Sequence, residues 1–174
     1  MHMIKIRQSL DTDMPAIERL YPAAFPDEDL LPLVKRLLAE EPDILSLVAE
    51  KGQSIAGHIL FTLCGLSHSS NQAALLAPLA VAPGHQRQGI GTALIREGLQ
   101  QLGSKGVDQV FVLGDPAYYG RCGFDPETAV APPYPLPEQW RQAWQSLSIG
   151  PAQTPNQGKL LLPELWLQPA LWAP

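Results

Sequence analysis

The chain has 174 residues, of which 45% are hydrophobic and 17% are charged, and its 12 Lys and Arg against 17 Asp and Glu give a formal net charge of −5. This length predicts one globular domain, residues 1–174, and no run of about 18 uninterrupted apolar residues is present to span a membrane. Lys and Arg are not clustered either, which argues against a nucleic-acid partner because affinity for phosphate backbones depends on such clusters.

No charged stretch followed by an apolar one opens the sequence, so the cytoplasm is the expected location. Two cysteines, Cys64 and Cys122, are too few for a disulfide scaffold and suit a reducing compartment. All 4 tryptophans lie at or beyond Trp140, and 10 of the 18 prolines follow residue 120. We therefore expect a core over residues 1–124 and a Pro- and Trp-rich part over residues 125–174 that completes the sheet.

Hydrophobic periodicity and turn residues predict the secondary structure. In chain order, the expected elements are a strand over residues 3–7, helices over residues 13–20 and 29–39, strands over residues 45–50, 54–64 and 73–81, a helix over residues 89–102, a strand over residues 107–113, a short helix from Pro116, a helix around residues 138–147 and a last strand over residues 159–167. Asp11 or Asp13 is expected to cap the first helix, and Asp115 the short one. Strands that alternate with helices predict an α/β fold.

The most informative segment runs from Val81 to Thr92, where an apolar strand ends in a Gly-bearing turn that opens into the long helix. Such a turn binds anions, because glycine lets the backbone approach a ligand and the free amides at a helix N-terminus favour phosphate. A Walker loop would need Lys after its final glycine, but Ile90 follows Gly89. A dinucleotide fingerprint would need a small residue where Leu94 stands. Neither nucleotide motif fits.

Gln86-Arg87-Gln88-Gly89-Ile90-Gly91 matches the Gln/Arg-x-x-Gly-x-Gly/Ala coenzyme A signature of the GNAT acetyltransferases. Downstream, residues 119–124 resemble the Tyr-x-x-x-Gly-Phe ending of the next motif of that superfamily. Residues 77–81 and 113–119 further resemble its small bacterial YhbS-type branch. The resemblance covers residues 3–124, and the tail is matched only through a Gly-x-x-x-x-Pro feature at Gly158.

This resemblance implies a mixed, largely antiparallel sheet flanked by helices, with splayed central strands that also accommodate Pro78 within a strand. It implies an N-acetyltransferase, in which a primary amine of a small-molecule or peptide acceptor attacks acetyl-CoA directly in a ternary complex, with no metal. Residues 125–174 are expected to form the acceptor side as well as to complete the sheet. A monomer or homodimer with no nucleic-acid or membrane partner is expected. The implied coenzyme A-binding residues are Leu79, Ala80, Val81, Gln86, Arg87, Gln88, Gly89, Ile90, Gly91 and Thr92.

The resemblance also assigns roles. The end of the strand at residues 79–81 is expected to pair with pantetheine, and an amide there to polarise the thioester carbonyl. The amides of residues 87–92 are expected to hold the pyrophosphate, with Gln86 shaping the turn. The Arg87 side chain lies near the phosphates or the adenosine 3′-phosphate in this interpretation, and its alternative is a solvated surface charge.

Tyr119 is the candidate general acid, because a phenol hydrogen-bonded to sulfur can protonate the leaving thiolate. Tyr118 points about 100° away on the helix and is expected to pack. The base stays open between Asp115, whose simplest role is to cap the short helix, and water. Glu28 and Asp29, in the loop that enters the second helix, are expected to line the acceptor mouth, and the direction of Glu50 stays open. His58, His68 and His85 show no metal-ligand spacing and are expected to be surface or packing residues.

Two other functions are compatible with the sequence. One is a non-catalytic coenzyme A-binding or acyl-CoA-sensing module that keeps the pyrophosphate loop; the presence of Tyr119 favours the enzyme. The other is a hydrolase with Cys122 as nucleophile, which the lack of a recognisable triad disfavours. Trp140 and Trp144, four residues apart, are expected on one helical face, where they pack in the core, wall the acceptor pocket or meet a second subunit.

Overall fold

The computed structural model describes residues 3–151 and 155–174, which divide into two compact units assembled from separate stretches of sequence. The units comprise Met1–Phe61 with Ala77–Gly98, and Thr62–Leu76 with Leu99–Pro174. Strands β3 (Ser54–Leu66) and β4 (Ser69–Val81) and helix α3 (Ile90–Ser104) contribute residues to both. None of the helices in these described ranges is long and apolar enough to cross a membrane.

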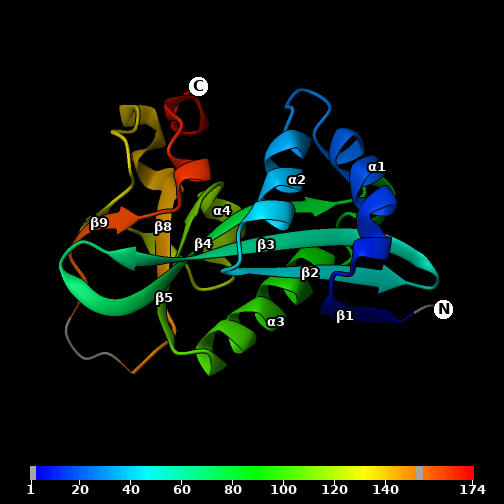
Figure 1. Cartoon of the computed structure of the whole chain (residues 1–174), viewed down its shortest axis with the longest axis horizontal. Helices are drawn as coiled ribbons and strands as arrows, with labels where there is room; N and C mark the ends of the chain where they lie inside the picture. The colour runs from blue at the N-terminus through cyan, green and yellow to red at the C-terminus, as the bar shows by residue number, and fades with distance from the viewer. Residues whose placement is uncertain (1–2, 152–154) are drawn as a thin grey trace. The chain divides into compact units, whose positions relative to one another are not determined.

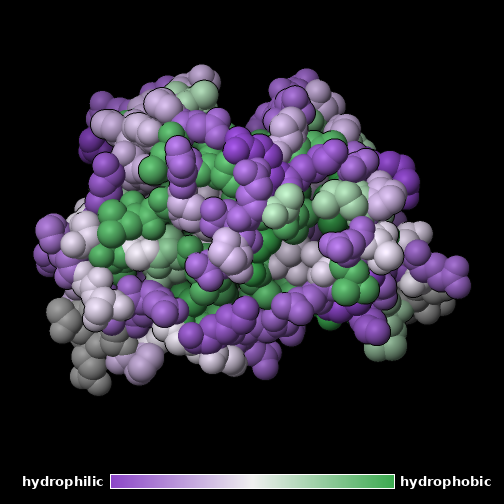
Figure 2. All heavy atoms as spheres, viewed as in Figure 1, coloured by the Kyte–Doolittle hydropathy of each residue, from purple (hydrophilic) through white to green (hydrophobic). Residues whose placement is uncertain are grey.

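In the first unit, the strands follow the order β1-β2-β3-β4, and β1 (Ile4–Gln8) pairs antiparallel with β2 (Ile44–Lys51). Helices α1 (Met14–Ala24) and α2 (Leu31–Glu40) connect β1 to β2. Figure 1 shows both helices on one side of β2 and β3, with α3 on the other. Figure 2 shows mainly hydrophilic side chains over the outer surface of α1 and α2, as expected of amphipathic helices.

Side-chain alternation along β3 explains the two helical faces. The Tyr21 hydroxyl of α1 lies 2.7 Å from His58 Nδ1. A Cβ on the neighbouring Gly57 would instead meet Ile90 Cγ2 and Leu94 Cδ1 of α3 at 3.0 Å. Because successive residues of a strand point to opposite faces, α1 packs on one face of β3 and α3 on the other.

Asp13 occupies the N-cap position of α1, as predicted, but its side chain makes no capping hydrogen bond to that helix. Its carboxylate accepts a hydrogen bond from the Leu10 amide at 2.7 Å and two from the Arg7 guanidinium, both at 2.8 Å. Neither α1 nor the 3₁₀ turn Asp11–Asp13 before it has a side-chain cap. The charge-assisted bidentate pair with Arg7 is the stronger alternative for this carboxylate.

In the second unit, β4 pairs parallel with β5 (Val107–Leu113), and β5 pairs antiparallel with β8 (Trp144–Ser148). Two short strands, β6 (Asp125–Pro126) and β7 (Val130–Ala131), pair antiparallel with β8 and parallel with β9 (Gly158–Leu161), respectively. β9 also pairs antiparallel with the end of β3. The structure confirms the predicted mixed α/β fold, with a largely antiparallel sheet flanked by helices.

The tail contains the largest error of the sequence prediction. Residues 138–147, expected as one helix, form a 3₁₀ turn, Glu138–Ala143, followed by strand β8. Trp144 therefore does not share a helical face with Trp140. Pairing of β8 with β5 satisfies the backbone that a helix would have satisfied locally, so tertiary context overrides helical spacing here.

The last strand is also shorter than the predicted residues 159–167. It ends at Leu161, and a 3₁₀ turn, Glu164–Trp166, follows. Pro163 stands between them and has no amide to donate to a sheet ladder. A further 3₁₀ turn, Pro169–Trp172, follows it.

Three tryptophans form an aromatic cluster in the second unit. Trp144 stacks on Phe111 with ring centroids 5.6 Å apart and meets Trp172 edge-on at 5.9 Å. Trp166 lies 6.4 Å from Trp172, and its Nε1 donates to Thr62 Oγ1 at 3.0 Å. Of the roles open to Trp144, core packing is the one that these contacts confirm.

The close approach of α3 to β3 predicts opposite effects for two glycines of the same helix. A Cβ on Gly98 would overlap the ring of Phe61, whereas one on Gly103 would meet nothing within 4 Å. Gly98→Ala should lower the free energy of unfolding by about 1–3 kcal/mol through overpacking. Gly103→Ala should raise it by about 0.5–1 kcal/mol, because alanine is the better helix former. Urea unfolding of both variants checks this, and a stabilised Gly98→Ala would contradict the packing.

Candidate functional site

The β4–α3 loop lies in the first unit, and its path is fixed by few hydrogen bonds. The Ala82 amide at the end of β4 donates to Ala56 O of β3 at 2.8 Å. A 3₁₀ turn, Pro83–His85, follows, and Gln86 Nε2 lies 3.4 Å from Val81 O. Gln86 therefore contacts the turn that it is expected to shape, through a long and weak hydrogen bond.

Two residues of the loop adopt the left-handed backbone region. Arg87 has φ 64° and Gly89 has φ 82°, and Arg87 is the non-glycine residue of the described chain with positive φ. Left-handed residues that interrupt ordinary ones turn successive amides into a concave anion-binding nest, and non-glycine residues rarely adopt this conformation outside functional sites. The first amides of α3 add unpaired donors directly after the nest.

Charge in this loop suits an anion. Residues 81–92 include Arg87 and contain no Asp or Glu, so no fixed negative charge of the loop itself opposes a phosphate. Gly89 O accepts the first helical hydrogen bond, from the Ala93 amide at 3.0 Å. The amides of residues 90–92 precede this bond and therefore have no acceptor within the helix. Backbone donors, more than side chains, therefore define what this loop can hold.

The strand that leads into the loop ends with Leu79, Ala80 and Val81, of which Ala80 is buried and the others half-buried. The parallel register of β4 with β5 covers residues 72–75 of β4. β4 continues to Val81 beyond that register, as splayed central strands require, and it passes through Pro78 after a cis peptide bond. The predicted pantetheine-pairing residues thus follow the last β5-paired segment of β4.

Tyr119 lies in the second unit, in the short helix α4 (Pro116–Gly120). Its ring packs on Gly114, where a Cβ would come within 2.5 Å of Tyr119 Cε2, and lies 5.0 Å from the ring of Tyr118 and 5.9 Å from that of Phe124. Burial raises its pKa above the ordinary value, so the phenol is protonated at neutral pH. Its hydroxyl has no hydrogen-bond partner among the described residues.

The other candidates near α4 have structural roles. Asp115 Oδ1 accepts from the Ala117 amide at 2.9 Å, which confirms the predicted cap of α4. The Tyr118 ring lies under the Arg121 guanidinium at 5.6 Å, consistent with packing.

Both cysteines are free thiols, and burial raises the pKa of Cys64 to about 12, so this thiol is not a reactive nucleophile.

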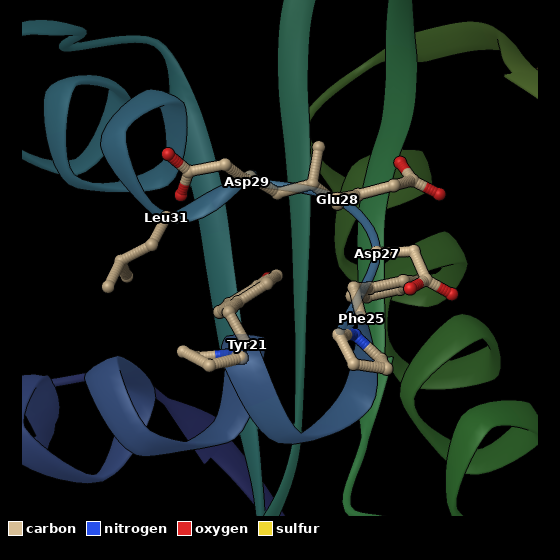
Figure 3. Close-up of a pocket in the computed structure, with 9 residues that line it drawn as sticks. Tyr21, Phe25, Asp27, Glu28, Asp29 and Leu31 are labelled. Atoms are coloured by element: carbon tan, nitrogen blue, oxygen red, sulfur yellow. The ribbon is translucent and has the colours of Figure 1, made fainter.

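A hollow of about 330 Å³ lies at the loop between α1 and α2, within the first unit. Tyr21 and Phe25, with ring centroids 6.2 Å apart, come from the C-terminal end of α1. Asp27, Glu28 and Asp29 line the same hollow. Figure 3 shows Asp27 and Glu28 extending to one side of the loop and Asp29 to the other. The hollow thus combines an aromatic wall with three carboxylates.

Tyr21 also belongs to a buried polar chain beneath this hollow. Its hydroxyl lies 2.7 Å from His58 Nδ1, and His58 Nε2 lies 2.8 Å from Ser46 Oγ. Ser9 Oγ donates to Ser46 Oγ at 2.6 Å. His58 is fully buried, and desolvation lowers its pKa from 6.5 to about 4 even though the Asp13 charge opposes the shift. The ring is neutral at pH 7 and confirms the prediction of a packing histidine.

Comparison with known proteins decides the family. The model of the Acetyltransferase (GNAT) family matches residues 11–124. The chain belongs to the GNAT acetyltransferases. It is 41% identical to the N-acetyltransferase YjhQ of Escherichia coli strain K12 over 128 residues, which cover 68% of this chain and 71% of YjhQ. As a GNAT acyltransferase, the chain is an enzyme of a family whose members transfer acyl groups.

Two solved GNAT structures resemble this chain over nearly its full length. The Escherichia coli N-acetyltransferase YhbS in complex with CoA has a TM-score of 0.86 at 26% identity, covering 97% of this chain and 94% of that one. A GNAT acetyltransferase from Brucella melitensis in complex with acetyl-CoA has a TM-score of 0.75 at 30% identity, covering 95% and 99%. One relative thus holds coenzyme A, and the other holds acetyl-CoA, the cosubstrate that the sequence analysis expects here.

The structure brings some predicted GNAT site residues together and adds others. Residues 79–81, at the end of β4, and residues 86–92, in the loop and the start of α3, belong to one continuous segment of the first unit, whereas Tyr119 belongs to the second. Sequence reasoning missed the aromatic wall formed by Tyr21 and Phe25, and it missed Lys51, whose Nζ donates to Gln88 Oε1 at 2.5 Å. No sequence signal pairs Lys51 with Gln88, because 37 residues separate them.

The buried histidine predicts a pH dependence of stability. Above pH about 6.5, His58 is neutral in both folded and unfolded chains, and its contribution is fully present. As pH falls toward 4, the unfolded chain binds a proton that the folded chain excludes, so stability is lost. The loss reaches at most about 3 kcal/mol. Urea unfolding between pH 7 and pH 4 should show this slope, and His58→Gln should flatten it; an unchanged slope in His58→Gln would exclude His58 as its source.

Proposed function

We propose that this GNAT enzyme transfers the acetyl group of acetyl-CoA to a primary amine by direct attack in a ternary complex. The observation that carries the proposal is the left-handed backbone of Arg87 and Gly89 immediately before α3, in a loop without acidic residues. Such a nest at a helix N-terminus suits a pyrophosphate and needs no metal ion as a bridge. The relatives solved with CoA and with acetyl-CoA support coenzyme A as the ligand.

In this proposal the chain's backbone holds the cosubstrate. Amides of residues 87–92 receive the pyrophosphate, Gln86 and Gln88 line the turn, and the strand end at residues 79–81 pairs with the pantetheine amides. An amide near Leu79 or Ala80 polarises the thioester carbonyl, which acetyl-CoA supplies as the activated acyl group. All of these residues belong to one continuous segment, so a single local structure accounts for cosubstrate binding.

The chemical step requires an acid and a proton acceptor. The neutral amine nitrogen forms a bond to the acetyl carbon, the carbon–sulfur bond breaks, and the thiolate receives a proton from the Tyr119 hydroxyl. Burial raises the pKa of Tyr119, so the phenol is protonated at neutral pH and its hydroxyl is available as a hydrogen-bond donor to the leaving sulfur. Water is the simplest acceptor for the proton that the amine loses.

The acceptor side is proposed at the hollow between α1 and α2. Glu28 and Asp29, expected at the acceptor mouth, line it together with Asp27 and an aromatic wall. Carboxylates favour a cationic amine, and aromatic faces also attract cations. A monomeric or homodimeric enzyme in the cytoplasm, formed as one domain over residues 1–174, completes the proposal.

Binding and turnover test the proposal separately. Calorimetry with acetyl-CoA in the presence of a chelator should show binding at micromolar to millimolar ligand, because backbone amides need no metal. A panel of polyamines, aminoglycosides, amino acids and peptide N-termini should then release free thiol from acetyl-CoA. Binding without release for any amine would favour the coenzyme A-sensing alternative. No binding by a folded sample would contradict the proposal itself.

Tyr119→Phe removes one hydroxyl but keeps the ring that packs on Gly114. Acetyl-CoA affinity should therefore change little, while the single-turnover rate should fall by about 100- to 10,000-fold, the usual contribution of a general acid. Tyr118→Phe is the matched control and should retain the parental rate. Single-turnover measurements avoid masking by slow product release. A rate for Tyr119→Phe within about threefold of the parent would assign the proton transfer to another donor.

A further inference from the structure

Lys51 is the last residue of β2, and its side chain reaches the loop that opens α3. Its Nζ donates to Gln88 Oε1 at 2.5 Å. Lys51 forms no ion pair with a carboxylate in the described parts of the chain. The neighbouring Glu50 accepts a hydrogen bond from Arg7 Nε at 2.7 Å. The Lys51 ammonium is therefore a cation held by a neutral amide beside the proposed phosphate loop.

The fold brings this lysine to the loop. Gly52, with φ 68°, opens the tight turn from β2 into β3. The Ala82 amide, at the end of β4, bonds to Ala56 O near the start of β3. The β2–β3 turn and the β4–α3 loop therefore lie at the same end of the strands in the first unit. A side chain of lysine length then spans the remaining gap to Gln88.

The position of the ammonium separates it from the backbone nest. Lys51 Nζ contacts the tip of the Gln88 side chain, whereas the nest and the first amides of α3 are main-chain groups. Coenzyme A carries a pyrophosphate, which amides can hold, and a separate 3′-phosphate on its ribose. A cation outside the nest suits the phosphate that the amides do not hold, because a dianion of this kind needs a charged partner.

We propose that Lys51 binds the 3′-phosphate of coenzyme A and makes the enzyme prefer coenzyme A to 3′-dephospho-CoA. The inference rests on the proposed function, which places the pyrophosphate in the β4–α3 loop. On binding, the ammonium exchanges the Gln88 amide oxygen for a phosphate oxygen, with Gln88 keeping the lysine stem in place. Lys51 is thus a specificity-determining residue for the cosubstrate and takes no part in acetyl transfer.

Affinities for coenzyme A and 3′-dephospho-CoA, measured by calorimetry at low ionic strength, test the proposal. Lys51→Met keeps most of the aliphatic stem and removes the charge. It should weaken coenzyme A binding about threefold to fivefold, as expected for one exposed ion pair, and leave 3′-dephospho-CoA binding unchanged. The difference should shrink in high salt, which screens exposed charges.

Three variants serve as controls. Lys51→Arg keeps the charge and should retain the preference. Lys35→Met removes the same charge from α2, on the other side of the strands from α3, and should change neither affinity. Gln88→Glu places a carboxylate beside Lys51 that both pairs with it and repels phosphate, so coenzyme A binding should weaken more than in Lys51→Met.

Each remaining outcome overturns the proposal. If Lys51→Met weakens the binding of both ligands equally, Lys51 contacts the pyrophosphate and not the 3′-phosphate. If the affinities for both ligands are unchanged, Lys51 contacts neither phosphate group. Tighter coenzyme A binding by Gln88→Glu would contradict the phosphate position. If the parent binds neither ligand, the proposed function fails together with the inference, whereas normal parental binding with an indifferent Lys51 leaves the proposed function intact.

Discussion

The alternation of side chains along β3 is the constraint on which the first unit depends. One residue, His58, points to α1, and the next toward the N-terminus, Gly57, leaves room for α3. A side chain at Gly57 would meet Ile90, the first residue of α3, so this glycine sets how closely the helix start approaches the strand. The proposed phosphate loop ends at that helix start, and its geometry therefore depends on packing inside the sheet.

The two faces of β3 carry different kinds of stabilisation. The α3 face is apolar and closely packed, as the buried Leu94 and the contact of Phe61 with Gly98 show. The α1 face contains a buried polar chain in which a neutral His58 bonds to two hydroxyl groups. Satisfied polar groups in a core are specific in geometry, because each unpaired partner would cost about 1–3 kcal/mol. Rigid packing thus supports the loop, and directed hydrogen bonds support the hollow.

Prediction from sequence worked where local chemistry decides the structure. The strand at residues 107–113 was predicted with its observed bounds, and Asp115 caps α4 as expected. It failed at residues 138–147, where helical spacing favoured a helix but pairing with β5 produced a strand. A short polar segment with tryptophans carries no local signal for the strand with which it pairs, and the paired residues of β5 lie 31 to 39 positions earlier in the chain.

The sequence by itself determined the family and the place of the loop, because Gln86 to Gly91 is a contiguous motif in which Gly89 supplies one of the two left-handed residues. It also named Tyr119 as the candidate acid, an assignment that stays a prediction. Only the tertiary structure decided which distant groups meet: Tyr21 with His58, and Lys51 with Gln88. Each of these pairs is separated by 37 residues, and such contacts depend on strand register and helix packing, which no local pattern encodes.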